Sequence, residues 1–285
     1  MNLSVALRLG RVSNQPTVWT NVLAGIVLAG GGRPVTIVGL IAGIAVMYTA
    51  GMFLNDAFDA DFDRAHRPER PIPSGQVTLT GVFSAGFAML ALGLALIVAT
   101  ALQAGIGGAA FASGAALAGV IVFYDWWHKD NAFGPLLMGL CRMLAYVTSA
   151  LAVSGAVNAA VLGAAIVALC YLIGLTYIAK QETLSQMGNL WPLGFLAVPF
   201  IYEFPTAIHD ALSAVLFAAL LAWVLYALSF LRTANRAIGK AVGYLIAGIC
   251  LLDALFVAAQ APSLALLAVA AFVLTLCLHR VVPGT

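Results

Sequence analysis

The sequence predicts an all-α membrane protein, a polytopic bundle of transmembrane helices that forms one integral domain over residues 1–285. Its residues are 63% hydrophobic and only 8% charged, and its mean hydropathy is +1.03. Apolar runs of about 18 or more residues, long enough to span a bilayer, recur along the chain. A soluble fold of this composition would have too few polar residues to cover its surface.

Ten apolar segments are expected to form the membrane spans. The seventh is short and carries Pro192 and Pro199, so we expect it to be broken or tilted. Small residues such as Gly39 and Gly43 recur inside the segments and let helices approach closely. The segments cover residues 16–31, 34–57, 78–101, 105–123, 132–153, 157–179, 188–204, 208–231, 239–259 and 262–280.

The basic residues predict the orientation of the chain. With ten spans, Arg33 alone lies on one side of the membrane and Arg142 lies inside a span. The other eleven of the thirteen basic residues share the opposite side, which the positive-inside rule makes cytoplasmic, together with both termini. They are Arg8, Arg11, Arg64, Arg67, Arg70, Lys129, Lys180, Arg232, Arg236, Lys240 and Arg280.

Acidic residues gather on the same side, although the sorting rule does not require it. The stretch NDAFDADFDRAHRPERPIPSG, from Asn55 to Gly75, holds four aspartates, one glutamate and three arginines. It begins inside an apolar segment, where charges are costly and are functional by default. No basic tract with interleaved aromatic residues is present, so nucleic acid is not an expected partner.

Asn55, Asp59 and Asp63 recur every four residues, which places them on one face if the second span continues as a helix. Asp56 and Asp61 then fall off that face. A row of carboxylates takes up a proton or binds a cation. Hard oxygen ligands suit Mg²⁺, which uses one or two carboxylates together with substrate phosphates. The alternative is a solvated loop that merely ends the helix.

The second half of the stretch supports a metal–diphosphate site. Arg67 and Arg70 flank Pro68 in a segment that Pro71 and Pro73 stiffen further. Stiff backbone holds guanidinium groups at fixed distances, and these groups bind phosphate oxygens in pairs. Taken singly, each arginine is also explained as a topology anchor.

These residues resemble the first aspartate-rich motif, NxxxDxxxD, of the UbiA family of intramembrane prenyltransferases. The resemblance implies that Asn55, Asp59 and Asp63 hold Mg²⁺ on an isoprenyl diphosphate. The stretch FYDWWHKDNAFGPLLMGLCRML resembles the Tyr-and-Lys loop of that family, which implies that Tyr124 and Lys129 contact the diphosphate. The EboC-like branch couples RPERPIPSG to a GPLxMGLCR segment in a similar way.

The chain departs from the family after the sixth span. The family carries a second motif, DxxxD, where this sequence reads TYIAKQETLSQMGN, with Glu182 as the one carboxylate. Lys180 replaces the second metal as a fixed cation, or Glu182 holds a metal weakly, or catalysis has been lost. Lys180 is also explained as a topology anchor. Arg142 needs a partner within the membrane and is a candidate diphosphate ligand. The family has nine helices, whereas the charge pattern here favours ten.

The sequence therefore predicts a Mg²⁺-dependent prenyltransferase of the inner membrane, with a site that faces the cytoplasm and takes an isoprenyl diphosphate and a lipophilic acceptor. Asp59, Asp63 and Lys129 are the expected catalytic residues. No motif identifies the acceptor. Two rival functions remain: a UbiA-type terpene cyclase, in which the isoprenoid attacks itself, and a membrane protein that binds an isoprenoid diphosphate without turnover.

Overall fold

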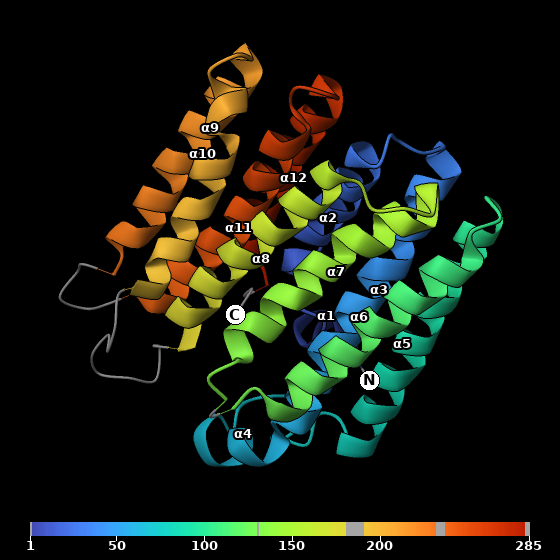
Figure 1. The fold of residues 1–285 in the computed structure, drawn as a ribbon. Helices are drawn as coiled ribbons and strands as arrows, with labels where there is room; N and C mark the ends of the chain where they lie inside the picture. The colour runs from blue at the N-terminus through green and yellow to red at the C-terminus, as the bar shows by residue number, and fades with distance from the viewer. Residues whose placement is uncertain (1, 130, 181–190, 232–236, 283–285) are drawn as a thin grey trace.

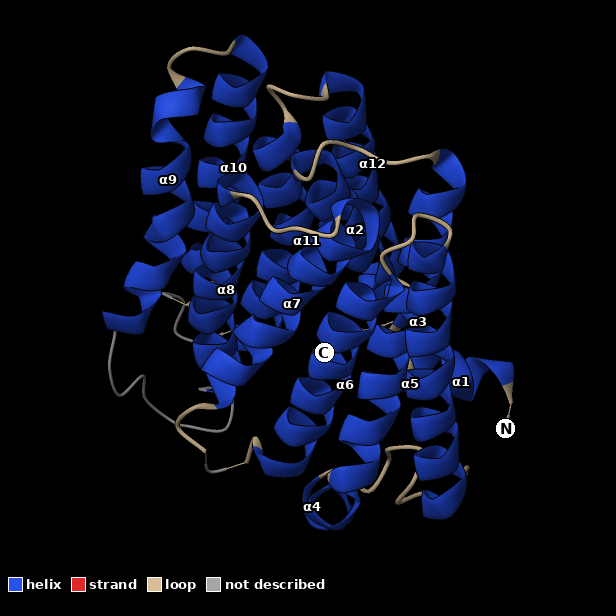
Figure 2. Cartoon of the chain, turned by 45° about the vertical axis from the view of Figure 1, so that its right-hand side comes forward, coloured by secondary structure: helices blue, strands red, loops and turns tan. Residues whose placement is uncertain are grey.

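The computed structural model describes residues 2–129, 131–180, 191–231 and 237–282, and within these ranges it contains helices and no strand (Figure 2). Figure 1 shows the helices running side by side as an elongated bundle, with one short helix across its lower end. The all-α membrane bundle predicted from the sequence is confirmed. The amino-terminal elements are α1 (Leu3–Leu9), a 3-10 helix η1 (Val12–Asn14), α2 (Gln15–Leu28), α3 (Pro34–Phe58) and the short transverse helix α4 (Ala60–His66).

The remaining elements carry the chain back and forth through the bundle. They are α5 (Leu79–Leu102), α6 (Gly107–Trp127), α7 (Gly134–Ser154), α8 (Ala159–Lys180), the 3-10 helix η3 (Trp191–Ala197), α9 (Val198–Ala207), α10 (Ala211–Ser229), α11 (Ile238–Val257) and α12 (Pro262–His279).

Each of the ten predicted segments contains helix. In the described part of the chain, eight helices are long and apolar enough to cross a membrane: α3, α5, α6, α7, α8, α10, α11 and α12. The first segment forms α2, which has 14 residues. The seventh is divided into η3 and α9, each with a proline at its second residue, Pro192 and Pro199. The predicted break is confirmed, because proline removes a backbone donor and starts a new helix more readily than it continues one.

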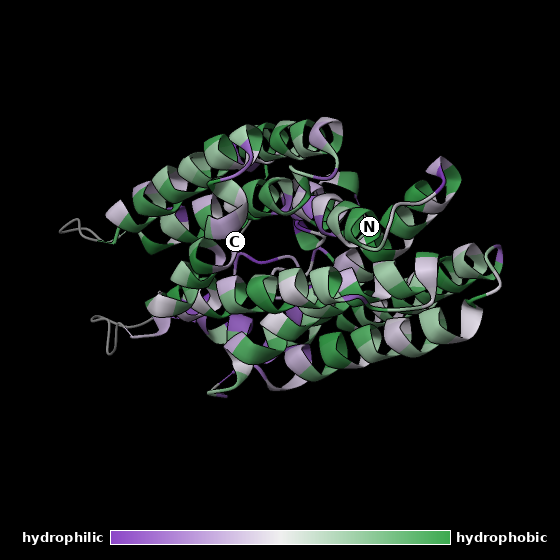
Figure 3. Ribbon diagram, turned by 45° about the horizontal axis from the view of Figure 1, so that its top comes forward, coloured by the Kyte–Doolittle hydropathy of each residue, from purple (hydrophilic) through white to green (hydrophobic). Residues whose placement is uncertain are grey.

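The amino-terminal segment and the end of α12 meet at one end of the bundle. The Nη2 atom of Arg8 donates to the side-chain oxygen of Gln76, which precedes α5, at 2.8 Å. The ring Nε2 of His279 lies 2.7 Å from Oδ1 of Asn14. These contacts place the start of α2 and the end of α12 at the same end of the bundle. Figure 3 shows apolar residues along the length of the helices of the bundle.

Of the three hydrophobic clusters in the described residues, two are built around α2 and α7, which contribute to both. One unites these two helices with α3, α5 and α6. The other unites them with α8, α10, α11 and α12. Helix α11 is the most enclosed of the eight long helices, with 78% of an 18-residue stretch of it buried. The seam along α2 and α7 is therefore where the two halves of the bundle join.

A buried polar network crosses this seam. Asp253 of α11 accepts hydrogen bonds from Thr20 and Asn21 of α2 and from the hydroxyl of Tyr146 of α7. On the other side of Asn21, Arg142 of α7 donates to its side-chain oxygen. Polar groups in the hydrocarbon core of a membrane cannot hydrogen-bond to water, so each must have a hydrogen-bond partner inside the bundle.

Close packing of α3 against α5 depends on paired glycines, as the small-residue pattern predicts. A Cβ atom on Gly93 would lie 2.7 Å from the carbonyl oxygen of Gly43, and one on Gly43 would lie 3.1 Å from the carbonyl oxygen of Gly93. Neither oxygen belongs to a flexible side chain, so the two backbones would have to separate.

We therefore expect Gly93→Ala to destabilise the protein by roughly 1–3 kcal/mol, the usual cost of overpacking. The measurement is the melting temperature in detergent. Gly119→Ala is the matched control, because Gly119 is an exposed glycine of α6 with nothing within 4 Å of an added Cβ. Equal melting temperatures for the two variants would contradict the close approach of α3 and α5.

Candidate active site

A cavity of about 280 Å³ lies between the two halves of the bundle. It is lined by residues of α2, α3, α6, α7, α8 and α11 and by the loop after α4. Most of its wall is apolar, and charged side chains gather where α3 ends. On α3 the lining runs at least from Ile44 to Met52, a length of about 12 Å along the helix axis at 1.5 Å per residue.

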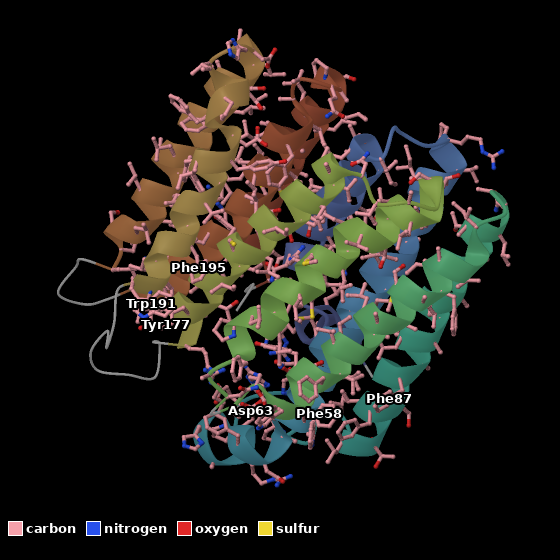
Figure 4. The ribbon with its side chains drawn as sticks, viewed as in Figure 1. Phe58, Asp63, Phe87, Tyr177, Trp191 and Phe195 are labelled. Atoms are coloured by element: carbon pink, nitrogen blue, oxygen red, sulfur yellow. The ribbon has the colours of Figure 1, made fainter. Side chains whose placement is uncertain are left out.

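The aspartate stretch forms the end of α3 and the transverse helix α4. Asp59 is the junction, with ψ near −1°, and its N–H bonds to the carbonyl of Asn55 at 3.0 Å. The N–H of Asp63 bonds in turn to the carbonyl of Asp59 at 2.8 Å. Figure 4 shows Asp63, a residue of α4, at the lower end of the bundle. The chain thus keeps its helical hydrogen bonds through the junction, while the three predicted metal ligands meet different partners.

Arg70 connects two of the carboxylates. Its Nη1 atom lies 3.1 Å from Oδ1 of Asp56 and 3.1 Å from Oδ2 of Asp63. Both carboxylates are largely buried. Arg67 and Arg70 also line the cavity, as expected for groups that bind a substrate anion. The proline-rich loop therefore returns its arginines to the aspartates that precede it in the chain.

Asp59 pairs with the loop between α6 and α7. Its Oδ1 lies 2.8 Å from Nζ of Lys129, and its Oδ2 lies 3.5 Å from Nε2 of His128. Burial raises the pKa of Asp59, but the hydrogen bonds and charges of His128 and Lys129 outweigh burial, and the net pKa is lowered. The carboxylate is therefore ionised at neutral pH. The ion pair stabilises the fold above the ordinary pKa near 3.8 and is lost as pH falls through the lowered value.

Asn55 contacts a carboxylate that the sequence analysis did not select. Its amide donates to Oδ1 of Asp125 at 3.2 Å, and Asp125 is only 3% exposed. The other oxygen of Asp125 is buried and has no hydrogen-bond partner. Asp125 also lines the cavity. Among the carboxylates gathered here, it is the one for which the described residues supply no cation within 4 Å.

Arg11 and Asp56 were also missed. Arg11 has φ of 41°, the one positive φ outside glycine in the described residues. This left-handed turn, uncommon for a residue with a side chain, precedes η1 and brings the guanidinium 3.6 Å from Asp56 and 3.5 Å from the side-chain oxygen of Asn55. Asp56 and Asp63 are seven residues apart, which is about two helical turns, and this spacing in the sequence could have identified Asp56 as a site residue.

The other predicted residues occupy different places. Tyr124 lines the cavity and stacks on His128, with ring centroids 5.0 Å apart. Arg142 also lines the cavity and donates to the backbone and hydroxyl oxygens of Thr17, at 3.1 and 2.9 Å. Lys180 donates to the carbonyls of His128 and Asn131, at 3.3 and 2.6 Å. Glu182 lies outside the described residues.

The oxygen donors suit Mg²⁺. In the described residues no three His, Cys, Asp or Glu side chains converge as a metal cage. Mg²⁺ does not need such a cage, because it is commonly bound by one or two carboxylates and by phosphate oxygens. The buried oxygen of Asp125 that lacks a hydrogen-bond partner is the observation that most favours a cation here, since a buried polar atom is costly unless a partner compensates it.

Comparison with known proteins identifies the family. Residues 18–237 match the model of the UbiA prenyltransferase family. The chain belongs to this family. Several relatives are named digeranylgeranylglyceryl phosphate synthase. That of Methanoculleus marisnigri is 30% identical over 100 residues, 35% of this chain and 36% of the relative. That of Sulfolobus acidocaldarius is 26% identical over 145 residues, 50% of this chain and 46% of the relative. These matches span less than half the length of either relative.

Solved structures of UbiA homologues share the fold. A homologue from Archaeoglobus fulgidus bound to DMAPP and Mg²⁺ has a TM-score of 0.52 at 17% identity, over 97% of this chain and 99% of that chain. A structure of a digeranylgeranylglyceryl phosphate synthase has a TM-score of 0.59 at 18% identity, over 90% and 97%. The predicted family and fold are confirmed, and the EboC-like branch stays a prediction.

The pairing of Asp59 gives a testable pH dependence. Lys129→Met removes the closest cation while leaving the carboxylate buried, so we expect the pKa of Asp59 to rise. The measurement is the infrared band of the protonated carboxyl group as pH is lowered, with the Asp59→Asn variant identifying the band. If the carboxyl group of Asp59 titrates at the same pH in Lys129→Met and in the parent protein, the ion pair does not set the charge of Asp59.

Proposed function

We propose that this UbiA-family protein transfers an isoprenyl group from an isoprenyl diphosphate to a lipophilic acceptor and depends on Mg²⁺. The supporting observation is the cavity. Its apolar interior ends at Asp125 and at the guanidinium groups of Arg67 and Arg70. Arg70 is paired with Asp56 and Asp63 behind the cavity wall. An isoprenyl diphosphate has the same division, with a hydrocarbon tail and a multiply charged head. Structures of a UbiA homologue from Archaeoglobus fulgidus contain such ligands, in one case DMAPP and in the other GPP, each together with Mg²⁺.

The diphosphate head is assigned to the charged end of the cavity. Arg67 and Arg70 line this end, and Tyr124 contributes a phenol to the same wall. Lys129 lies beside Asp59 at 2.8 Å. Guanidinium and ammonium groups donate several hydrogen bonds to phosphate oxygens and balance their charge. We assign Mg²⁺ to Asn55, Asp59 and Asp63, with Asp125 as a further carboxylate near Asn55.

Ion-pair exchange links the two parts of the site. Arg70 pairs with Asp56 and Asp63, each at 3.1 Å. A cation bound to Asp63 would weaken that pair, because both positive charges compete for one carboxylate. Arg70 would then turn to the diphosphate. Metal and substrate are accordingly expected to bind together more tightly than either binds alone.

Transfer begins when the bond between the first isoprenyl carbon and the bridging oxygen breaks. The electron pair leaves with the diphosphate, and an allylic cation remains. Mg²⁺, when bound, supplies positive charge that stabilises the leaving diphosphate. Arg67, Arg70 and Lys129 add to that stabilisation, and loss of one such contact typically costs 10²–10³ in rate. The apolar cavity wall excludes water, so that the acceptor's electron pair forms the new bond and the acceptor releases a proton.

The remaining assignments concern positioning and topology. Lys180 donates hydrogen bonds to the carbonyls of His128 and Asn131 and so positions the loop that carries Lys129. A direct contact between Lys180 and the diphosphate remains a proposal. Arg142 is proposed as a polar contact farther along the cavity, and Glu182 as a weak metal ligand. We place the site on the cytoplasmic side of the inner membrane, where the basic loops predict it.

A binding protein without turnover is the second candidate. The segment from Thr176 to Asn189 contains no aspartate, so the second motif of the family is missing. Mass spectrometry of purified protein with Mg²⁺ and isoprenyl diphosphates of several lengths, with and without lipid extract, tests the function. We expect a prenylated product only when extract is present. Product without extract indicates a cyclase, and bound substrate without product indicates a binding protein.

The metal assignment predicts that Asp59→Asn and Asp63→Asn each abolish Mg²⁺-dependent binding of geranyl diphosphate. The reason is that both carboxylates lie at the charged end of α3 and supply the hard oxygen ligands. Calorimetry with and without Mg²⁺ makes the measurement. Asp61→Asn is the matched control, since Asp61 has a 94% exposed side chain paired with Arg64. Unchanged Mg²⁺-dependent binding in both site variants would rule out these ligands.

A further inference from the structure

A second hollow, distinct from the active-site cavity, lies between α10, α11 and α12. Its volume is about 820 Å³. Lys240, in the first turn of α11, and Arg280, which follows α12, line it together with His279. His279 contacts Asn14, so the hollow is at the end of the bundle where the amino-terminal segment also lies. We call it the α10–α12 groove.

The groove is strongly biased towards positive charge. Lys240 and Arg280 are both exposed, and neither forms an ion pair with a carboxylate in the described residues. From Ala211 to the end of the chain the sequence has a single acidic residue, Asp253. That residue is fully enclosed in the network with α2 and α7. The groove therefore presents two cations and no negative partner from its own helices.

The walls of the groove are aromatic and held in place. Trp223 donates its indole N–H to the carbonyl of Tyr244 at 2.7 Å. Tyr226 and Tyr244 pack on each other with centroids 5.4 Å apart. Gly239 and Gly243, one turn apart on α11, line the groove without side chains to fill it. Amphipathic aromatic rings are typical of the level where a bilayer meets water.

We propose that the α10–α12 groove binds the head group of an anionic membrane phospholipid. Lys240 and Arg280 would contact the phosphate, and the rings of Trp223 and Tyr226 would lie along the start of the acyl chains. Basic pockets between transmembrane helices are a known way to hold acidic lipid head groups. A zwitterionic lipid fits less well, because its ammonium group brings a third positive charge into a groove that offers no carboxylate.

The lipid site is separate from the active site but shares a wall with it. On α11, Gly243 and Tyr244 face the groove, whereas Val242 and Ile246 face the cavity. Across the wall, His279 of the groove lies 2.7 Å from Asn14, which lines the cavity. A lipid in the groove would therefore not compete with a diphosphate in the cavity.

The test titrates delipidated protein in detergent with phosphatidylglycerol or phosphatidylcholine and counts bound lipids by native mass spectrometry. We expect phosphatidylglycerol to bind the parent at least tenfold more tightly. The double variant Lys240→Gln, Arg280→Gln should lose roughly ten- to thirtyfold in phosphatidylglycerol affinity and little in phosphatidylcholine affinity. The matched control is Arg33→Gln with Arg64→Gln, which removes the same charge outside the groove.

Three results would overturn the proposal. They are equal binding of the two lipids by the parent, an equal loss in the control variant, and a preference for phosphatidylglycerol that survives in the double variant. Inorganic phosphate that displaces the lipid at matched concentration would identify a free-phosphate site instead. Both substituted residues are exposed, and a melting temperature equal to that of the parent confirms the fold. The single variants should each give an intermediate affinity.

Discussion

The buried carboxylate of Asp253 determines how the two halves of the bundle join. It accepts from Thr20 and Asn21 on α2 and from Tyr146 on α7, while itself belonging to α11. In hydrocarbon no water replaces a lost partner, so these three helices can pack in few other registers. The cavity lies between the same helices and α3, α6 and α8, and its position follows from that register.

Charge compensation organises the end of α3 in a similar way. Asp56 and Asp63 share Arg70, and Asp59 has Lys129. The cations come from the amino-terminal turn, from the proline-rich loop and from the loop after α6, so three distant segments converge on one helix end. Each pair is partly buried and would be costly to break without replacement. A metal ion and a diphosphate together provide that replacement, a cation for the carboxylates and an anion for the basic groups.

Lys180 has a structural role at the position where the second aspartate motif is missing. Its amine holds two backbone carbonyls of the loop that carries Lys129. The cation thus organises a neighbouring loop from the position where the family supplies metal ligands. Asp125, which lines the cavity, offers a buried carboxylate oxygen that has no hydrogen-bond partner. The acidic part of the site is consequently concentrated on α3, α4 and α6.

The sequence by itself determined the class of the protein, the ten helical segments and the charged end of α3. These follow from local properties: apolar length, the break at Pro192 and Pro199, and the spacing of Asn55, Asp59 and Asp63. Only the tertiary structure decided which polar and charged side chains contact one another. Arg11, Asp56 and Asp125 were missed because their roles depend on a left-handed turn, a shared arginine and a neighbouring helix. Hydrophobic periodicity says which segments enter the membrane, but only packing in three dimensions says which buried charges meet.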